Sequence, residues 1–175
     1  MYNEEIKKVE LNKVQNMLEW LKTKLFLDSI SDKAKNRKVH RGEVYLCNFG
    51  IGVGSEMQKY RPSVIIQGNV GNINSSNVIV APITHTEKSI PSMAKIDTQI
   101  SLKDGTTILN GCVNLSNIQT VSKARLGDFI TKLTKEDINR INDSILVSLG
   151  LMKEFKKLND KIEKQEKYIE KLKNI

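Results

Sequence analysis

The sequence holds few of the residues on which metal and nucleophile chemistry depends. Its 175 residues include only 2 Cys and 2 His. Cys47 and Cys112 lie far apart and have no CxxC partner, which excludes a disulfide framework, and the scarcity of histidine argues against a zinc site. We expect each cysteine to be a small buried apolar residue.

Several familiar motifs and segments are also missing. The glycines at 50, 52 and 54 fit neither nucleotide-binding fingerprint, and the chain has no GxSxG nucleophile motif. No uncharged apolar run is long enough to span a bilayer, and the first residues lack the apolar core of a signal peptide. We therefore expect a cytoplasmic protein that does not engage a membrane.

Positive charge is in excess, and most of the excess lies at the two ends of the chain. The net charge is +8, of which residues 41–151 carry +2 and each flank carries +3. A basic chain favours an anionic partner. The flanking lysines themselves are more typical of solvated helix faces than of a dedicated RNA-binding arm.

Both flanks have the periodicity of amphipathic helices. Residues 4–27 carry a leucine-rich seam at alternating spacings of three and four, and residues 151–172 repeat it as a heptad in which Gln165 is the one polar member. Such seams need a partner, which can be the other arm, the core or a second copy of the chain.

These patterns divide the chain into three segments. Residues 31–40 have the composition of a flexible joint. The expected organisation is an N-terminal helical arm with this joint (1–38), a core domain (39–151) and a C-terminal heptad helix (152–175).

Between the arms the apolar period changes to two, which is typical of β-strands. Short β-branched runs separated by Gly, Asn and Ser turns occur at 42–49, 62–68, 77–84, 93–97, 106–109, 112–121 and 128–133. The spacing predicts a mainly β fold with helices, built as a compact antiparallel sheet or small barrel. Pro82 predicts an edge, a bulge or a shortened strand in the third run.

A further helix is predicted after the last strand. Thr134 offers an N-cap, with Asp137 at the third helical position. The apolar face then recurs at Ile138, Ile141, Ile145 and Leu149. Because the heptad begins immediately after Gly150, this helix is expected to run on into the C-terminal arm.

Charged side chains crowd together in the loop "GSEMQKYRP" at 54–62. Pro62 excludes the helical region for the residue before it, so Arg61 is expected to be extended. A guanidinium held in this way suits a phosphate, which it can bind through two parallel hydrogen bonds. Spacing alone favours the simpler interpretation, an ordinary ion pair between Arg61 and Glu56.

The ordered motifs of the centre resemble those of the MazF/PemK family of toxins from type II toxin-antitoxin systems. They are "RGEVY", "GSEMQKYRP", the second strand "VIIQ" with its Asn-rich turn, and a third strand ending in "APIT". "NIQTVSKARL" and the helix that ends at "VSLGL" resemble the later part of the family. The resemblance covers about residues 39–151 and excludes both arms.

The resemblance implies a small SH3-like barrel, usually a homodimer, that cuts single-stranded RNA without a metal ion or other cofactor. The implied reaction is internal attack by a 2′-hydroxyl, which leaves a cyclic phosphate and a 5′-hydroxyl. The implied partner is a cognate antitoxin that covers the RNA groove. The family's catalytic arginine and threonine fall on Arg61 and Thr84, and Glu56 is a chemically plausible base.

A set of RNA contacts is also predicted, in which Ser55 matches a family position close to the RNA. This set comprises Ser55, Lys59, Tyr60, Gln67, Asn72 and Gln119. Two interpretations of Tyr60 stay open, since its ring can stack on a base or pack against the barrel. Gln119 replaces an arginine that the family usually carries, so a cation that assists the phosphate is missing from this position.

Two other functions remain open at this point. The same barrel is used by CcdB-like toxins, which poison DNA gyrase by protein contact and cut nothing. The missing arginine at Gln119 and the long arms also fit a catalytically weak member that acts as an interaction protein.

Overall fold

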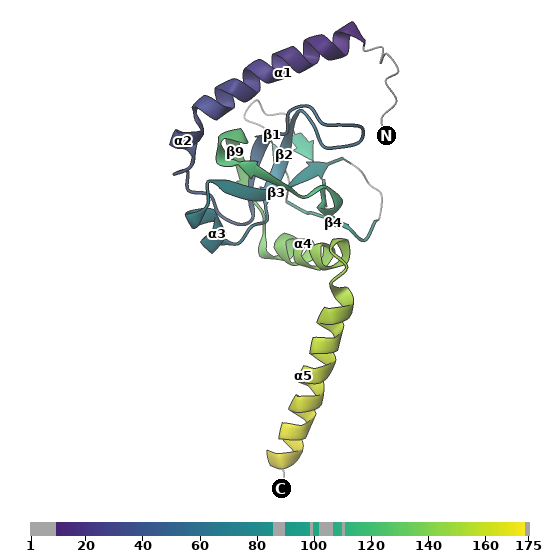
Figure 1. The fold of residues 1–175 in the computed structure, drawn as a ribbon. Helices are drawn as coiled ribbons and strands as arrows, with labels where there is room; N and C mark the ends of the chain where they lie inside the picture. Colours follow the sequence, from purple (N-terminus) through teal and green to yellow (C-terminus); the bar gives the residue numbers. More distant parts are fainter. Residues whose placement is uncertain (1–9, 86–89, 99, 102–106, 110, 174–175) are drawn as a thin grey trace, which may run out of the picture.

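A computed structural model describes residues 10–85, 90–98, 100–101, 107–109 and 111–173. Its main element is a seven-stranded antiparallel sheet in the order β4-β7-β3-β2-β1-β9, with β8 also paired to β3 (Figure 1). The strands of this sheet are β1 (Glu43–Asn48), β2 (Tyr60–Ile65), β3 (Asn77–Thr84), β4 (Met93–Lys95), β7 (Cys112–Asn114), β8 (Gln119–Ser122) and β9 (Leu126–Lys132). A separate two-stranded sheet pairs β5 (Ile100–Ser101) with β6 (Thr107–Leu109). The prediction of a mainly β fold with helices is confirmed.

Local side-chain chemistry explains where the predicted strands were wrong. The run 112–121 is interrupted by a 3-10 helix, η1 (Leu115–Asn117), because the Asn114 side chain accepts the Ser116 amide at 3.0 Å and turns the chain. The predicted turn at 68–77 contains a short helix, α3 (Asn69–Asn74).

Pro82 neither ends nor shortens β3, which spans the whole predicted run. The residue lies where the neighbour of β3 changes: pairing with β8 ends at Val80, and pairing with β7 begins at Ile83. On the other edge Pro82 is paired with Ser63 of β2. A residue without an N–H is therefore tolerated in the middle of the sheet at a break in the ladder.

The two faces of the sheet bury separate hydrophobic clusters. Val64 of β2 and Ile83 of β3 belong to the cluster on which α4 (Lys135–Ser148) packs. Ile65 and Val80 belong to the cluster on the opposite face. Since successive strand residues alternate between faces, Arg61 projects on the face of Ile65, away from α4.

Helix α4 begins as predicted, and its cap is tied to the sheet. Thr134 Oγ1 accepts the Asp137 amide at 3.1 Å. The Asp137 carboxylate, 0% exposed, accepts the amides of Asp97 at 2.9 Å and Thr98 at 3.3 Å, together with the Thr98 hydroxyl and the Arg140 guanidinium. One buried carboxylate thus joins the first turn of α4 to the chain after β4.

The prediction that α4 runs on into the C-terminal arm is wrong. Gly150 has φ +70°, its amide bonds to the Val147 carbonyl at 3.0 Å, and the Leu151 amide bonds to the Leu146 carbonyl at 2.8 Å. These two bonds form a Schellman motif, which ends a helix at a left-handed glycine. Helix α5 (Met152–Lys173) starts afresh beyond it.

The two arms lie at opposite ends of the molecule and do not pair within one chain (Figure 1). The N-terminal arm forms α1 (Leu11–Ser29), followed by α2 (Ser31–Ala34) in the predicted joint. The apolar seam residues of α1 are between 40% and 80% exposed, and those of α5 between 48% and 56%. No helix in the described part of the chain is long and apolar enough to cross a membrane.

Candidate active site

Arg61 and Thr84 come from neighbouring strands. The register of β2 and β3 pairs Ser63 with Pro82, and continuing it by two residues sets Arg61 opposite Thr84. Residues opposite each other in antiparallel strands project on the same face, with Cβ atoms about 5 Å apart. The sheet therefore brings together the two residues that the resemblance assigned to catalysis.

The same line continues across five strands. Thr84 pairs with Cys112 of β7, Cys112 pairs with Lys95 of β4, and Arg61 pairs with Cys47 of β1. We call Lys95, Cys112, Thr84, Arg61 and Cys47 the Arg61 row. Lys95 is exposed, Cys47 is buried, and the three residues between them are partly buried, so the row rises from the core to the surface.

The Arg61 guanidinium is anchored by the loop that precedes it. Its Nε donates to the Gln58 carbonyl at 3.1 Å, and Arg61 lies within β2, as its place before Pro62 predicts. Glu56 instead accepts the Val53 amide through Oε2 at 2.8 Å. In the described structure Glu56 and Arg61 form no ion pair, so the simpler interpretation of the loop is wrong.

The loop is closed at its base by a backbone ladder. The Phe49 amide donates to the Lys59 carbonyl at 2.9 Å, and the Lys59 amide donates to the Gly50 carbonyl at 2.7 Å. Lys59 has φ +67°, the only positive value at a non-glycine residue in the described part. Such a conformation persists only when the surroundings enforce it. Ser55 and Glu56 lie at the exposed tip of the loop.

Two of the predicted RNA contacts lie far from the Arg61 row. Gln67 follows the other end of β2, six residues or roughly 20 Å from Arg61, and its Nε2 donates to the Asn77 carbonyl at 3.4 Å. Asn72 is 1% exposed, and its Nδ2 donates to the Gln67 carbonyl at 3.1 Å. Asn72 therefore holds a turn, and the prediction that it contacts RNA is corrected.

Gln119 and Tyr60, two further predicted RNA contacts, lie closer to the Arg61 row. Gln119 pairs with Val80, four residues or roughly 13 Å along β3 from Thr84, and it projects on the same face. The missing family cation is therefore not adjacent to Arg61. Tyr60 is 58% exposed, but as the strand neighbour of Arg61 it projects on the opposite face.

The two cysteines have different environments. Burial raises the pKa of the Cys47 thiol to about 12, despite the opposing effect of Arg125, so this residue is an inert core thiol as predicted. Cys112 is only partly buried and lies beside Thr84. In the described part, no three His, Cys, Asp or Glu side chains form a group that could hold a metal ion.

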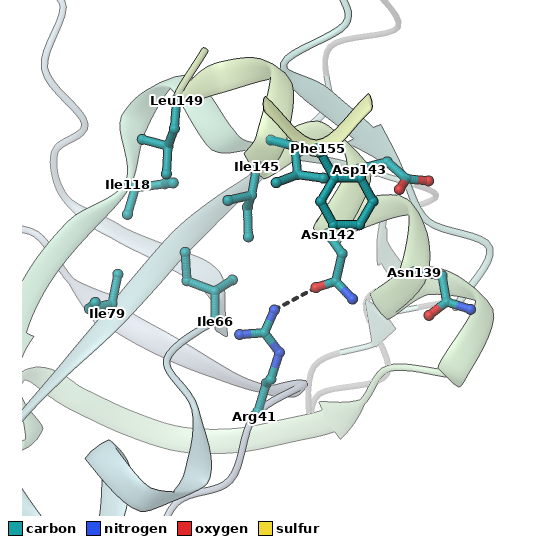
Figure 2. A pocket seen from close by; sticks show the side chains of 11 residues that line it. Arg41, Ile66, Ile79, Ile118, Asn139, Asn142, Asp143, Ile145, Leu149 and Phe155 are labelled. Atoms are coloured by element: carbon teal, nitrogen blue, oxygen red, sulfur yellow. Dashed lines mark hydrogen bonds between the residues drawn. The ribbon is translucent and has the colours of Figure 1, made fainter. Parts of the chain in front are cut away.

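A second concavity lies on the α4 face of the sheet. It is a groove of about 850 Å³, where isoleucine side chains from the sheet and α4 meet Phe155 of α5 (Figure 2). Its polar edge is the hydrogen bond from Arg41 to Asn142 Oδ1 at 2.6 Å, and burial lowers the pKa of Arg41. The groove offers apolar contact but no arginine-hydroxyl pair of the kind found in the Arg61 row.

Residues 40–149 match the family described as PemK-like, MazF-like toxin of type II toxin-antitoxin systems. The chain belongs to this family. Among curated MazF relatives, endoribonuclease MazF4 of Mycobacterium tuberculosis and endoribonuclease MazF1 of Mycobacterium bovis are each 31% identical over 111 residues, which cover 63% of the chain and 92% of the relative. The arms lie largely outside this match.

Solved MazF-type structures show the same fold. A mycobacterial endoribonuclease is 29% identical with a TM-score of 0.52, over 66% of this chain and 94% of its own. A mycobacterial endoribonuclease solved with its cognate antitoxin is 31% identical with a TM-score of 0.50, over 65% and 96%. MazF from Deinococcus radiodurans, 16% identical with a TM-score of 0.53 over 65% and 98%, supports the fold alone. The gyrase-poisoning alternative is not favoured.

Sequence reasoning did not connect Lys95 and Cys112 with Thr84. Both lie on short strands of three residues, and only the pairing of β4 with β7 and of β7 with β3 reveals that they flank Thr84. No motif marks either residue. The alternation "MAKID" does place Lys95 on the opposite face from its buried neighbours, but it does not say which strand lies next to it.

Proposed function

We propose that the chain is an endoribonuclease toxin that cuts single-stranded RNA at the Arg61 row. The observation that carries the proposal is the register of β2 and β3, which brings Arg61 next to Thr84 when it is extended two residues beyond the Ser63–Pro82 pair, in a chain that belongs to the MazF-like family. The relatives named endoribonuclease support the activity, and the relative solved with an antitoxin supports a cognate antitoxin as the partner that silences it. We further propose that the toxin acts in the cytoplasm as a homodimer.

The proposed reaction is internal transfer at phosphorus. The RNA 2′-oxygen loses its proton to a base and bonds to phosphorus, the bond from phosphorus to the 5′-oxygen breaks, and the 5′-oxygen gains a proton. The products are a 2′,3′-cyclic phosphate and a 5′-hydroxyl. No metal ion enters this scheme, since the charge that builds up on the phosphorane is met by an arginine.

Each side chain has a role that its chemistry allows. Arg61 binds the phosphorane oxygens through its N–H groups, and a guanidinium is a poor proton donor because it stays charged in proteins. Thr84 donates a hydrogen bond to a phosphate oxygen or orients the 2′-hydroxyl. Glu56 is the candidate base, and its carboxylate accepts the Val53 amide within the same loop.

The test is cleavage of a long single-stranded RNA by the purified full-length protein in EDTA. Single-stranded DNA of the same sequence serves as the control, since it has no 2′-hydroxyl. Cutting of the RNA at short, recurring sequences with the DNA intact supports the proposal. Intact RNA, or equal cutting of the RNA and the DNA, contradicts it.

Lys95 is expected to supply a cation to the Arg61 row, although it does not lie at the position of Gln119. It is exposed and lies two strands from Thr84 in the Arg61 row, where its side chain can reach a neighbouring phosphate. Lys95→Gln should therefore reduce the slope of log K against log salt for RNA binding by about 0.7. It should weaken binding more than it lowers the rate of cleavage of bound RNA.

The matched control for this prediction is Lys135→Gln. Lys135 is equally exposed but belongs to α4, on the other face of the sheet. Titrations at several salt concentrations measure both slopes. Identical slopes for the two variants would remove Lys95 from the RNA-binding surface.

Cys112 provides a chemical probe of the site. It is partly exposed beside Thr84, whereas Cys47 is buried with a raised pKa, so iodoacetamide should modify Cys112 alone. The added group should displace RNA and lower cleavage by at least about 10-fold. Bound RNA should protect the thiol.

The control is Cys112→Ser, which should cut RNA normally and resist inactivation. Mass spectrometry of the alkylated protein identifies the modified residue. Full activity after complete alkylation of Cys112 would place the RNA elsewhere on the molecule.

A further inference from the structure

Trp20 connects the N-terminal arm to the core. It lies on α1, outside the family match at 40–149, and is partly buried while the seam of the same helix is exposed. Figure 1 shows α1 beside the loop that joins β1 to β2. The arm therefore contacts the family domain next to the loop that carries Glu56 and leads to Arg61.

The Trp20 ring packs directly on Gly50, the first residue of this loop. A Cβ atom at Gly50 would lie 2.2 Å from the ring carbon Cζ2, far inside contact distance, so only glycine fits beneath the ring. The φ of Gly50, +77°, also favours glycine. Ring and backbone are therefore fitted to each other at this point.

Arg125 contacts both the Trp20 ring and the end of β1. Its guanidinium lies 5.2 Å from the centroid of the Trp20 ring, within cation-π range. Its Nη1 donates to the carbonyls of Asn48 at 3.2 Å and Phe49 at 3.1 Å, the last residues before the loop. Trp20 and Arg125 together enclose the chain where β1 ends.

Gly50 is hydrogen-bonded to Lys59, the residue that immediately precedes β2. The Gly50 carbonyl accepts the Lys59 amide at 2.7 Å, and Lys59 has the strained φ of +67°. Lys59 is two residues before Arg61, whose Nε is in turn bound to the carbonyl of Gln58. A short path of contacts thus leads from Trp20 through Gly50 and Lys59 to the catalytic arginine.

We propose that Trp20 is a positioning residue for the active site, and that α1 belongs to the catalytic unit of this chain. By covering Gly50, the ring keeps the loop base closed and Lys59 in its strained conformation, and this fixes the direction of Arg61. The inference rests on the proposed endoribonuclease activity. It assigns to the N-terminal arm a role in positioning Arg61, although the arm lies outside the family match.

The test compares full-length Trp20→Ala and Trp20→Phe with the unaltered protein. Single-turnover RNA cleavage should slow by about 10- to 100-fold in Trp20→Ala, with a smaller change in KM, because a misaligned arginine affects the transition state most. Trp20→Phe keeps a ring over Gly50 and should recover most of the rate. Phe26→Ala, on the exposed part of the same helix, should leave the rate unchanged.

Amide hydrogen exchange supplies a readout that does not depend on activity. In Trp20→Ala the Lys59 amide should exchange faster, while the amides of Val64 and Val80 in the central strands should stay protected. If the unaltered protein does not cut RNA, the proposed function fails. The exchange data still test whether Trp20 stabilises the loop conformation at Lys59. Unchanged Lys59 exchange, an unchanged rate, or a loss of protection spread over the core would each overturn the inference.

Discussion

Replacement of Arg61 by alanine is expected to lower the rate of RNA cleavage by about 10²- to 10³-fold. The guanidinium belongs to the residue that the extended register of β2 and β3 sets next to Thr84, and its Nε is already fixed on the Gln58 carbonyl. Its remaining N–H groups can bind the phosphorane without first being ordered. The loss should therefore appear in kcat, with a much smaller effect on RNA affinity.

Two further variants separate charge from geometry. Arg61→Lys keeps the charge but loses the planar fork, so it should restore only part of the rate. Lys135→Gln removes a cation from the other side of the sheet and should cut normally. Thermal unfolding verifies that Arg61→Ala remains folded. Equal rates for Arg61→Ala and the unaltered protein would remove Arg61 from the mechanism.

Replacement of Asp137 by alanine is expected to cost about 3 kcal/mol of folding free energy or more. The carboxylate is fully buried and accepts two backbone amides, a hydroxyl and a guanidinium. Removing it leaves the amides of Asp97 and Thr98 without their partner. It also removes the hydrogen bonds that connect the first turn of α4 to the chain after β4. Urea unfolding measures the loss.

The same helix offers a matched control. Asp143 is exposed on α4, so Asp143→Ala should change the free energy of unfolding by no more than about 0.5 kcal/mol. A small effect of Asp137→Ala, comparable to that of the control, would show that the buried network contributes little.

The stability of the protein should also depend on Asp137 at acid pH. Burial alone would raise the pKa of this carboxyl, but the hydrogen bonds from Thr98, the Asp97 amide, Arg140 and Thr134 outweigh it and lower the pKa to about 2 from 3.8. The folded state therefore binds this proton less readily than the unfolded state does. The resulting stabilisation, about 2 kcal/mol, is present above pH ~4 and is lost as the pH falls toward 2.

Asp137→Asn tests this dependence, because it removes the titrating group while keeping the shape of the side chain. Unfolding free energies between pH 5 and pH 2 should fall more steeply for the unaltered protein than for the variant. Parallel curves would mean that other carboxyls account for the loss of stability between pH 5 and pH 2.

Local patterns were sufficient to predict most elements of this fold. The period-two runs located β3 at its observed bounds, and Thr134 marked the start of α4, because alternation and capping are properties of adjacent residues. The break at Gly150 was missed because the heptad after it resembles a continuing helix. Only the backbone, with φ +70°, shows the left-handed stop.

The site was less predictable because it depends on strand pairing. Arg61 and Thr84 were assigned by resemblance, whereas Lys95 and Cys112 became visible only through register. Asn72 was included among the predicted RNA contacts, but its burial gives it a structural role. Trp20 could not be connected to Gly50 from the sequence, since nothing local links residues thirty positions apart.

The most direct test of the account is the mass of the fragment ends produced from a long single-stranded transcript by the full-length protein in EDTA. Internal attack at the Arg61 row predicts 2′,3′-cyclic phosphates on the upstream fragments and 5′-hydroxyls on the downstream fragments, both formed at least about 10²-fold more slowly with Arg61→Ala. An intact transcript, fragments with 5′-phosphate and 3′-hydroxyl ends, or the same ends formed at an equal rate with Arg61→Ala would contradict it.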